Sequence, residues 1–438
     1  MNSTLRWHLG LVVPPISGHL NPALSVAREL VDRGHRVTCF GLSDARRHAD
    51  AAGVGFIPVA AREFPEVTVP TWMRAQGELA GLKAMRWILG CLQRENLAYL
   101  RELPVAFQSA GVEGALIDQL AFGAASVAQH RKLPYVTLCN ALPVHADRSV
   151  PPFATTWAPL PPRWEALRSG IGMTVLRPLL TAHWRSLNAQ RRAWGLPDMC
   201  PETMADSPRA VLSQQPREFE FGVRKLPAHH HLTGPWVRPT NRGEVAFPFE
   251  RLDGRPLIYA SMGTLQNRIA SVFRTIAGAC DGLGAQLVIA QGARDAEPLG
   301  ELPGNPIVVG FAPQLALLKR ASLVITHAGL NTALETLAHG VPMVAIPVAN
   351  DQPGVAARLR AAGAGELVPF SRLSVGRLRA AVARVLSVPT YRESAQRLAR
   401  EIGRRDGASW AADVIEESLA RTGRGGQTDE LVGCSGAR

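Results

Sequence analysis

The chain has 438 residues, of which 46% are hydrophobic and 19% are charged, and this apolar fraction excludes global disorder. Because single hydrophobic cores stop growing near about 250–300 residues, we expect two domains. The 48 lysines and arginines outnumber the 36 acidic residues, which leaves anionic partners open, but no basic block with interleaved aromatic residues is present and we expect no nucleic-acid binding.

The sequence gives no sign of a targeting or membrane-spanning segment. Its first apolar run is cut by Pro14 and Pro15, and no uncharged apolar stretch elsewhere reaches the roughly 20 residues that a spanning helix needs. The six cysteines lie far apart without a CxxC pair, which argues against a disulfide scaffold or a cysteine-rich zinc site. We therefore expect a cytoplasmic protein, with peripheral membrane contact left open.

Strand and helix patterns alternate in the first part of the chain. Apolar periodicity predicts helices over residues 22–33 and 45–52. Short apolar runs predict strands at Leu9–Val13, Arg36–Gly41, Gly114–Asp118 and Leu133–Cys139. This alternation with short connections predicts a parallel sheet with helices on both faces.

The pattern loosens between Thr71 and Trp194, where six of the nine tryptophans lie. The segment Arg163–Trp194 has six arginines and a single acidic residue, Glu165. Its composition would suit the surface of an anionic membrane, but Pro178 argues against one long amphipathic helix there.

A passage rich in proline and glycine follows, and it predicts a linker over residues 234–254. Beyond it the alternation restarts, with helices expected over residues 269–283, 315–320 and 331–339. The expected strands are Pro256–Ala260, Gln286–Ala290, Pro306–Val309, Leu323–Thr326 and Val344–Pro347. We therefore predict an α/β protein with parallel-sheet domains at 1–233 and 255–400, a C-terminal helix at 401–420 and a flexible tail at 421–438.

Polar residues of special interest follow the strand that ends at Thr326. His327, Gly329, Thr332 and Glu335 come at the turn into a helix, and ligands of parallel α/β sheets bind at this edge. Free N–H groups at a helix N-terminus suit a phosphate, which His327 and Thr332 could also bind, while Glu335 could accept ribose hydroxyls. The same residues also fit a plain strand-to-helix turn with satisfied polar caps.

Four segments together carry a family resemblance. They are Gly18-His19-Leu20-Asn21-Pro22, Ser261-Met262-Gly263-Thr264, Phe311-Ala312-Pro313-Gln314, and the stretch from His327 through Glu335 to Asp351-Gln352. In this order and spacing they resemble the GT-B, family-1 glycosyltransferases, near the bacterial branch of zeaxanthin and macrolide-type glycosyltransferases. The resemblance spans nearly the whole chain. It implies two Rossmann-like domains facing a cleft, the first for an acceptor and the second for a nucleotide sugar.

The resemblance also implies the roles of donor-binding residues. Phe311 takes the place of a tryptophan that stacks on uracil in many relatives, which leaves the base, and hence UDP or dTDP, open. The pair Asp351-Gln352 is associated with binding the hydroxyls of glucose. The other implied donor-binding residues are Gln314 near the base or ribose, Glu335 at the ribose, and Ser261, Gly263, Thr264, His327, Gly329, Asn331 and Thr332 around the diphosphate.

His19 is the candidate catalytic base. It follows the first strand in a loop bounded by glycine and proline, and a neutral imidazole can take a proton from a hydroxyl near neutral pH. Asp118 ends the strand Gly114–Asp118 at the same edge, and it matches the position of the histidine's carboxylate partner in relatives. The alternative is that His19 and Asp118 only cap the helices that follow them.

The expected activity is inverting transfer of a hexose, glucose in the first place, from a UDP-sugar to a hydroxyl of a lipophilic small molecule of carotenoid type, such as zeaxanthin. A polyketide or macrolide aglycone is the alternative acceptor, and a nucleotide-sugar epimerase or a non-catalytic partner protein is the alternative class. No Asp-x-Asp motif is present, so we expect neither metal nor cofactor. Consecutive residues His229, His230 and His231 cannot converge on one ion, and we expect them in a solvated loop.

Overall fold

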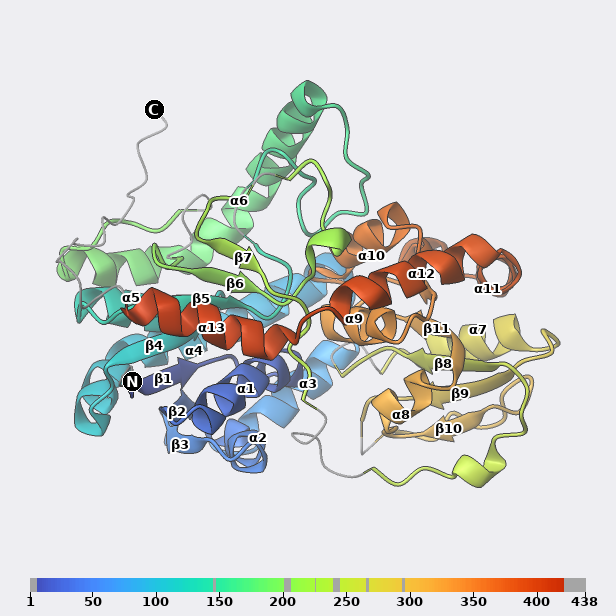
Figure 1. Cartoon of the computed structure of the whole chain (residues 1–438), viewed down its shortest axis with the longest axis horizontal. Coiled ribbons are helices and arrows are strands. Elements are labelled where there is room, and N and C mark those ends of the chain that lie inside the picture. The colour runs from blue at the N-terminus through green and yellow to red at the C-terminus, as the bar shows by residue number, and fades with distance from the viewer. Residues whose placement is uncertain are drawn as a thin grey trace.

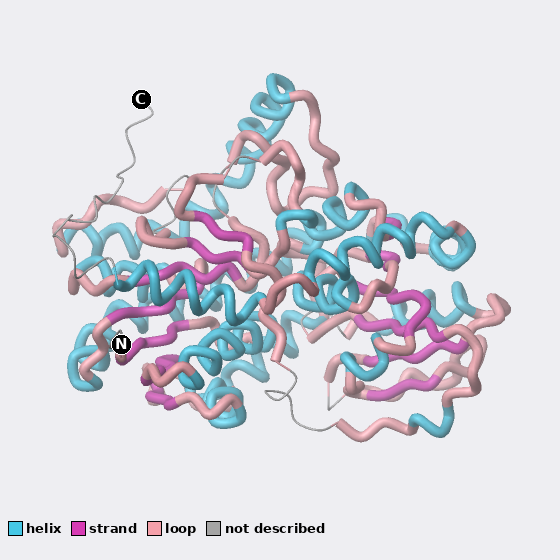
Figure 2. The backbone as a smooth tube through the Cα atoms, viewed as in Figure 1, coloured by secondary structure: helices cyan, strands magenta, loops and turns pink. Residues whose placement is uncertain are grey.

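The computed structural model of the chain describes residues 6–144, 147–200, 206–224, 226–238, 245–264, 268–293 and 296–420, and leaves out the side chains of residues 175–177 and 179–183. Two separate sheets lie side by side, each with helices on its faces (Figures 1 and 2). All the strand pairs of the described residues are parallel. The predicted fold class is thereby confirmed.

The first sheet has the strand order β3-β2-β1-β4-β5-β6-β7. Its strands are β1 (His8–Val12), β2 (Arg36–Gly41), β3 (Gly55–Pro58), β4 (Gly114–Asp118), β5 (Tyr135–Cys139), β6 (Val211–Ser213) and β7 (His230–Leu232). Its helices are α1 (Ser17–Asp32), α2 (Arg46–Ala51), α3 (Thr68–Gly77), α4 (Gly81–Ala110), α5 (Phe122–His130) and α6 (Pro162–Ala193). The expected loop at His229–His231 is wrong, because His230 and His231 pair with β6 as an edge strand.

The second sheet has the strand order β10-β9-β8-β11-β12-β13. Its strands are β8 (Leu257–Ser261), β9 (Gln286–Ala290), β10 (Ile307–Val309), β11 (Ala321–Thr326), β12 (Met343–Ala345) and β13 (Gly365–Leu367). The helices of this half are α7 (Ala270–Cys280), α8 (Gln314–Leu318), α9 (Leu330–Ala338), α10 (Gln352–Ala361), α11 (Val375–Ser387) and α12 (Pro389–Ile402). Helix α13 (Gly407–Ala420) follows these helices in the chain but packs against the first sheet's half of the molecule.

Helix α13 returns to the first half of the molecule and lies along α1 (Figure 1). Its apolar face joins the core beneath the first sheet through Ala411 and Ile415, both fully buried. On the rim, Arg33 of α1 binds Asp413 at 2.6 Å and Glu416 at 2.9 Å. This packing ties the C-terminal segment to the N-terminal sheet.

Helix α6 runs from Pro162 to Ala193 through Pro178, so the expectation that this proline precludes a long helix is wrong. A proline inside a helix removes one backbone hydrogen bond and bends the axis, and a long helix can tolerate this. The first part of α6 accordingly projects away from the body of the molecule (Figure 1).

Candidate active site

The carboxyl ends of the first sheet's strands carry a row of polar side chains. Asp118 is the last residue of β4, Asn140 follows β5 and Gln214 follows β6. His19 lies in the first turn of α1, directly after β1. Because parallel strands end at one edge, these four side chains gather there.

His19 and Asp118 form a hydrogen-bonded pair, with 2.8 Å between Nδ1 and Oδ2. The carboxylate of Asp118 is fully buried, and it also accepts hydrogen bonds from Asn140 Nδ2 at 2.6 Å and from the N–H of Leu120 at 2.8 Å. Burial alone would lower the pKa of His19, but the charge and hydrogen bond of Asp118 outweigh it, and the pKa is raised. With its proton held on Nδ1, the neutral ring presents a lone pair on Nε2.

A second carboxyl group lies near this pair and was missed in the sequence. Glu95 of α4 is buried and accepts a hydrogen bond from the hydroxyl of Tyr99. Burial, assisted by the charge of Asp118, raises the pKa of Glu95 to about 8. Near pH 7 Glu95 is therefore mostly protonated.

The second sheet's edge holds His327 between two glycines. A Cβ added to Gly263 would lie 2.4 Å from Cε1 of His327, and one added to Gly329 would lie 2.4 Å from its Nε2. Side chains are therefore excluded at both positions while the ring stays in place. Burial lowers the pKa of His327 to about 4, so the imidazole is neutral near pH 7.

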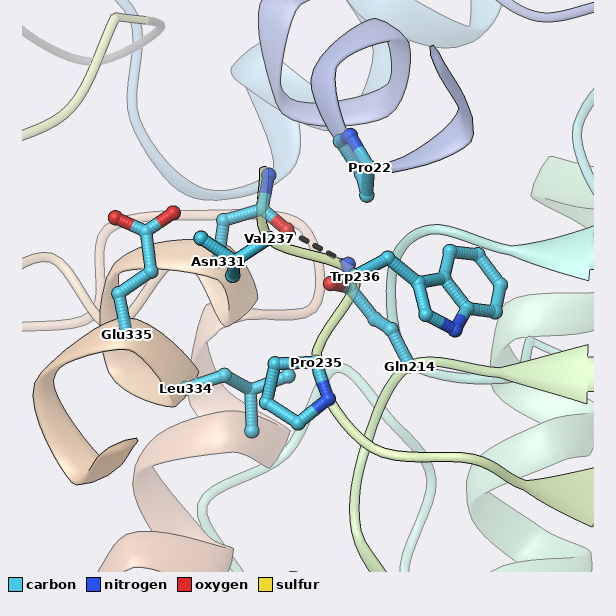
Figure 3. Close-up of a pocket in the computed structure, with 8 residues that line it drawn as sticks. All are labelled: Pro22, Gln214, Pro235, Trp236, Val237, Asn331, Leu334 and Glu335. Carbon is cyan, nitrogen blue, oxygen red and sulfur yellow. Dashed lines mark hydrogen bonds between the residues drawn. The ribbon is translucent and has the colours of Figure 1, made fainter. Parts of the chain in front are cut away.

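Asn331, in the first turn of α9, contacts the first turn of α1, which holds His19, so the prediction that His19 lies in a loop is wrong. Its Nδ2 donates to the carbonyl oxygen of Gly18 at 2.7 Å, and its Oδ1 accepts from Gln214 at 2.6 Å (Figure 3, dashed line). Pro22 has no N–H with which to occupy that carbonyl from within α1. The turn predicted to bind phosphate therefore contacts Gly18, the residue that precedes His19 in the chain.

The expected nucleoside-binding residues lie along α9 and α8. Gln314 donates to Glu335 at 2.8 Å and accepts from the hydroxyl of Tyr259 at 3.3 Å. Glu335 lines a small pocket together with Asn331, Gln214 and Pro22 (Figure 3). Phe311, which follows β10, is 38% exposed.

Two further residues of the predicted donor site form hydrogen bonds with residues of the first half of the chain. Oδ2 of Asp351 accepts from the N–H of Leu142 at 3.1 Å, and the hydroxyls of Thr264 and Ser17 lie 3.2 Å apart. Gln352 instead binds the loop that precedes it, because its Oε1 accepts hydrogen bonds from the N–H groups of Val348 and Ala349 at 2.8 and 3.0 Å.

The hydroxyl of Ser261, at the end of β8, accepts from the N–H of Gly263 at 3.3 Å. Thr332 lies in the first turn of α9, beside Asn331. The structure thus brings both segments to the edge where His327 lies.

A buried ion-pair network, also missed in the sequence, joins α10 to the first half of the molecule. Glu220 accepts from Arg358 of α10 at 2.7 and 2.9 Å, and from Arg224 at 2.7 Å. Arg224 also binds Asp147 at 2.9 Å. Since α10 begins at Gln352, this network fixes the helix that follows Asp351.

Two features are absent from the described residues. No cluster of three or more histidine, cysteine, aspartate or glutamate side chains there is arranged to hold a metal ion. No helix in the same part of the chain combines the length and the apolar character needed to cross a bilayer.

Comparison with known proteins gives one consistent family. Residues 274–412 match the model described as Erythromycin biosynthesis protein CIII-like, C-terminal domain. The chain is 30% identical over 420 residues to a zeaxanthin glucosyltransferase of Pantoea ananas, covering 94% of this chain and 96% of that one. It is 29% identical over 423 residues to a demethyllactenocin mycarosyltransferase of Streptomyces fradiae, covering 94% and 87%.

Solved structures agree with the sequence relatives. The structure of the glycotransferase of kitacinnamycin matches with a TM-score of 0.73 at 26% identity, and covers 94% of this chain and 99% of that one. The resemblance drawn from the four motifs is confirmed, and the chain belongs to the glycosyltransferases of the GT-B fold.

Proposed function

We propose that the protein transfers a hexose, glucose in the first place, from a UDP-sugar to a hydroxyl group of a lipophilic small molecule, with inversion at the anomeric carbon. The observation that carries this proposal is the contact between Asn331 and Gly18. It sets the base candidate His19 beside the helix terminus suited to the diphosphate, as a direct displacement requires.

In this mechanism His19 is the general base. Nε2 takes the proton of the acceptor hydroxyl while that oxygen forms a bond to the anomeric carbon, and the bond from this carbon to the diphosphate oxygen breaks. Asp118 stabilises the imidazolium that forms, as in a serine-hydrolase dyad. The hydrogen bonds from Asn140 and Leu120 hold the carboxylate of Asp118 in position.

The leaving diphosphate gains negative charge, which the second sheet's edge is suited to stabilise. Helix α9 begins at Leu330 without a side-chain cap, so its N–H groups and a dipole equivalent to about half a positive charge are available. The side chains proposed to assist are Ser261, Thr264, His327, Asn331 and Thr332. Donors fixed before the reaction lower its barrier without having to reorganise.

The remaining donor contacts follow the family's pattern. We assign Glu335 to the ribose, Phe311 and Gln314 to the base, and Asp351 and Gln352 to the sugar hydroxyls. The contacts of Gln314 with Glu335 and of Asp351 with Leu142 support these roles, because each side chain is already oriented by a hydrogen bond. The proposed donor is UDP-glucose, and we expect no metal or cofactor requirement.

The acceptor's apolar character is supported by a cluster beside the catalytic pair. Ile16 precedes α1, Leu120 follows Asp118 by two residues, and both pack with Met73, Ile88 and Leu92 of α3 and α4. An apolar wall next to a general base suits a mainly apolar alcohol. A carotenoid acceptor is favoured by the zeaxanthin glucosyltransferase relatives.

A second candidate acceptor is a polyketide or macrolide aglycone. The 29% identity to a mycarosyltransferase and the match to the erythromycin-type model favour it. This alternative changes the acceptor and takes either a UDP-sugar or a dTDP-sugar as the donor, and it keeps the roles of His19 and Asp118.

The test is mass spectrometry of reactions that pair UDP-glucose or dTDP-glucose with xanthophylls, macrolide aglycones and simple apolar alcohols. A glycosylated xanthophyll formed from UDP-glucose supports the first proposal, and a glycosylated macrolide supports the second. UDP-glucose incubated alone is the control, because conversion of the sugar without an acceptor would indicate epimerisation. Absence of any glycoside across the panel would contradict both acceptor proposals.

A further inference from the structure

The projecting part of α6 presents an apolar stripe that no described part of the chain covers. Trp164, Leu167 and Ile171 are 65%, 56% and 59% exposed. Their spacing of three and four residues places them on one face of the helix. This part of α6 lies away from the body of the molecule (Figure 1), so the stripe is presented to the surroundings.

The other face of the same turns is packed. Glu165 and Ser169 are buried, and they bind the segment 147–161, which we call the strap. Ser169 Oγ donates to the carbonyl of Val150 at 3.0 Å, and the N–H of Leu160 donates to Glu165 at 2.7 Å. These bonds fix which face of α6 points outward.

The strap extends the apolar surface. Its residues Trp157 and Leu160 are each 38% exposed, and the guanidinium of Arg168 lies 4.8 Å from the ring centre of Trp157. Tryptophan rings with basic neighbours are typical of side chains placed at a membrane–water boundary.

The charge around the stripe is positive. Between residues 147 and 174, which span the strap and the first turns of α6, the chain has three arginines, Arg148, Arg163 and Arg168, and two acidic residues, Asp147 and Glu165. The side chain of Glu165 is fully buried and paired with Arg168, and that of Asp147 is 17% exposed and paired with Arg224. The exposed side chains of Arg148 and Arg163 leave the stretch positive. A negatively charged surface would therefore be attracted.

We infer that the stripe of α6, Trp164, Leu167 and Ile171, docks the protein onto the surface of an anionic lipid membrane. A standard protein–protein interface takes roughly 20–30 residues from each partner, and the stripe with its two strap neighbours is far smaller. Insertion into a lipid headgroup layer needs only a few apolar side chains with basic residues beside them.

The strap connects this surface to the active site. A Cβ on Gly354 would lie 2.3 Å from the carbonyl oxygen of Phe153, so the strap's backbone contacts α10 directly, two residues after Gln352. Arg360 of α10 also donates to the carbonyl of Thr156 at 3.3 Å. Docking would thus hold the cleft next to the lipid in which a lipophilic acceptor dissolves, and this part of the inference rests on the proposed function.

The experiment is flotation of the full chain with phosphatidylcholine vesicles that contain or lack phosphatidylglycerol. The stripe variant is Trp164→Gln/Leu167→Gln/Ile171→Gln. The matched control is Val67→Gln/Leu82→Gln/Val105→Gln, which changes residues that are 68%, 52% and 67% exposed on or beside α3 and α4. We expect the wild-type chain and the control to float with the anionic vesicles. The stripe variant should bind roughly 10³-fold more weakly, since each of the three large apolar side chains inserted contributes about tenfold.

Three results would overturn the inference: no flotation of the wild-type chain with either vesicle, equal loss in both variants, or a wild-type dimer in light scattering that the stripe variant turns into a monomer without any vesicle binding. Transfer to an acceptor dissolved in detergent is measured on the same samples. If the wild-type chain transfers no sugar, the proposed function fails, while the flotation result still decides the docking surface.

Discussion

The narrow space between Gly329 and His327 allows a sharp test of the donor site. Gly329 has φ −62°, which alanine adopts without strain, so Gly329→Ala changes nothing except the added methyl group. The three atoms nearest to that methyl all belong to the His327 ring, the first at 2.4 Å, whereas ordinary contacts of a Cβ lie at 3.4–4 Å. The ring must therefore move by about 1 Å, and a displacement of that size can cost about 10²-fold in a function that depends on placement.

We expect Gly329→Ala to weaken the binding of UDP-glucose by about 10²-fold, or about 2.7 kcal/mol. His327→Ala removes the side chain that we propose binds the diphosphate, and it should weaken binding by about 1.5–3 kcal/mol. Because the added methyl acts only through the ring, the double variant should bind no worse than His327→Ala. Titration calorimetry measures all three affinities, and thermal unfolding shows that each variant is folded.

The matched control is Gly376→Ala in α11, where nothing lies within 4 Å of the added methyl. It should bind UDP-glucose like the wild-type chain. Normal binding by Gly329→Ala would refute the proposed contact, and so would an additive loss of about 10³–10⁴-fold in the double variant, since additivity indicates independent sites.

Further variants test the catalytic pair and the ion-pair network. His19→Ala should lower the transfer rate by about 10²–10⁴-fold and leave UDP-glucose affinity unchanged, and substantial residual transfer would remove His19 from the mechanism. In the wild-type chain the raised pKa of His19 means that kcat/KM rises with pH through a midpoint above the ordinary 6.5, since only neutral imidazole accepts a proton. Asp118→Asn should move this midpoint to lower pH and reduce the rate, and an unmoved midpoint would contradict the assigned partner. Arg358→Met leaves Glu220 buried with one arginine and should cost about 3–5 kcal/mol in urea unfolding, while the exposed Arg360→Met serves as control, and equal losses would contradict the argument. The lowered pKa of Glu220 implies that its stabilisation is present above pH 4.5 and is lost as pH falls through the folded-state pKa.

The sheets could be predicted where their strands form apolar runs. β1 and β9 are almost wholly buried, so they stand out as continuous apolar runs. Among the strands of three residues, β10 and β12 were predicted from their apolar runs, whereas β6, β7 and β13 were not. β7 contains two histidines, and β13 begins with Gly365 and Glu366. Their pairing comes from the neighbouring strands and not from their own composition.

Some residues of the candidate site could be predicted from the sequence and others could not. Asp118 was predicted because it ends a recognisable strand and matches a family position, and Asn140 obeys the same rule one strand further along. Gln214 could not be predicted because β6, which it follows, was itself not detected. The bond between Glu220 and Arg358 joins residues 138 apart in the chain, and no local pattern specifies such a partner.

Pro22 shows why one local rule failed at this site. Proline favours the first position of a helix, which predicts a start at residue 22, yet α1 begins at Ser17 and holds Pro22 inside it. An internal proline costs a helix about 3 kcal/mol or more, because the carbonyl four residues earlier loses its donor and the ring crowds that carbonyl. Here that carbonyl belongs to Gly18, and it accepts from Asn331 of the opposite half. Helix α1 thus lacks one internal hydrogen bond at Gly18, and the same carbonyl instead forms a hydrogen bond between the two halves, next to His19. Departures from local helix preference are expected at functional sites.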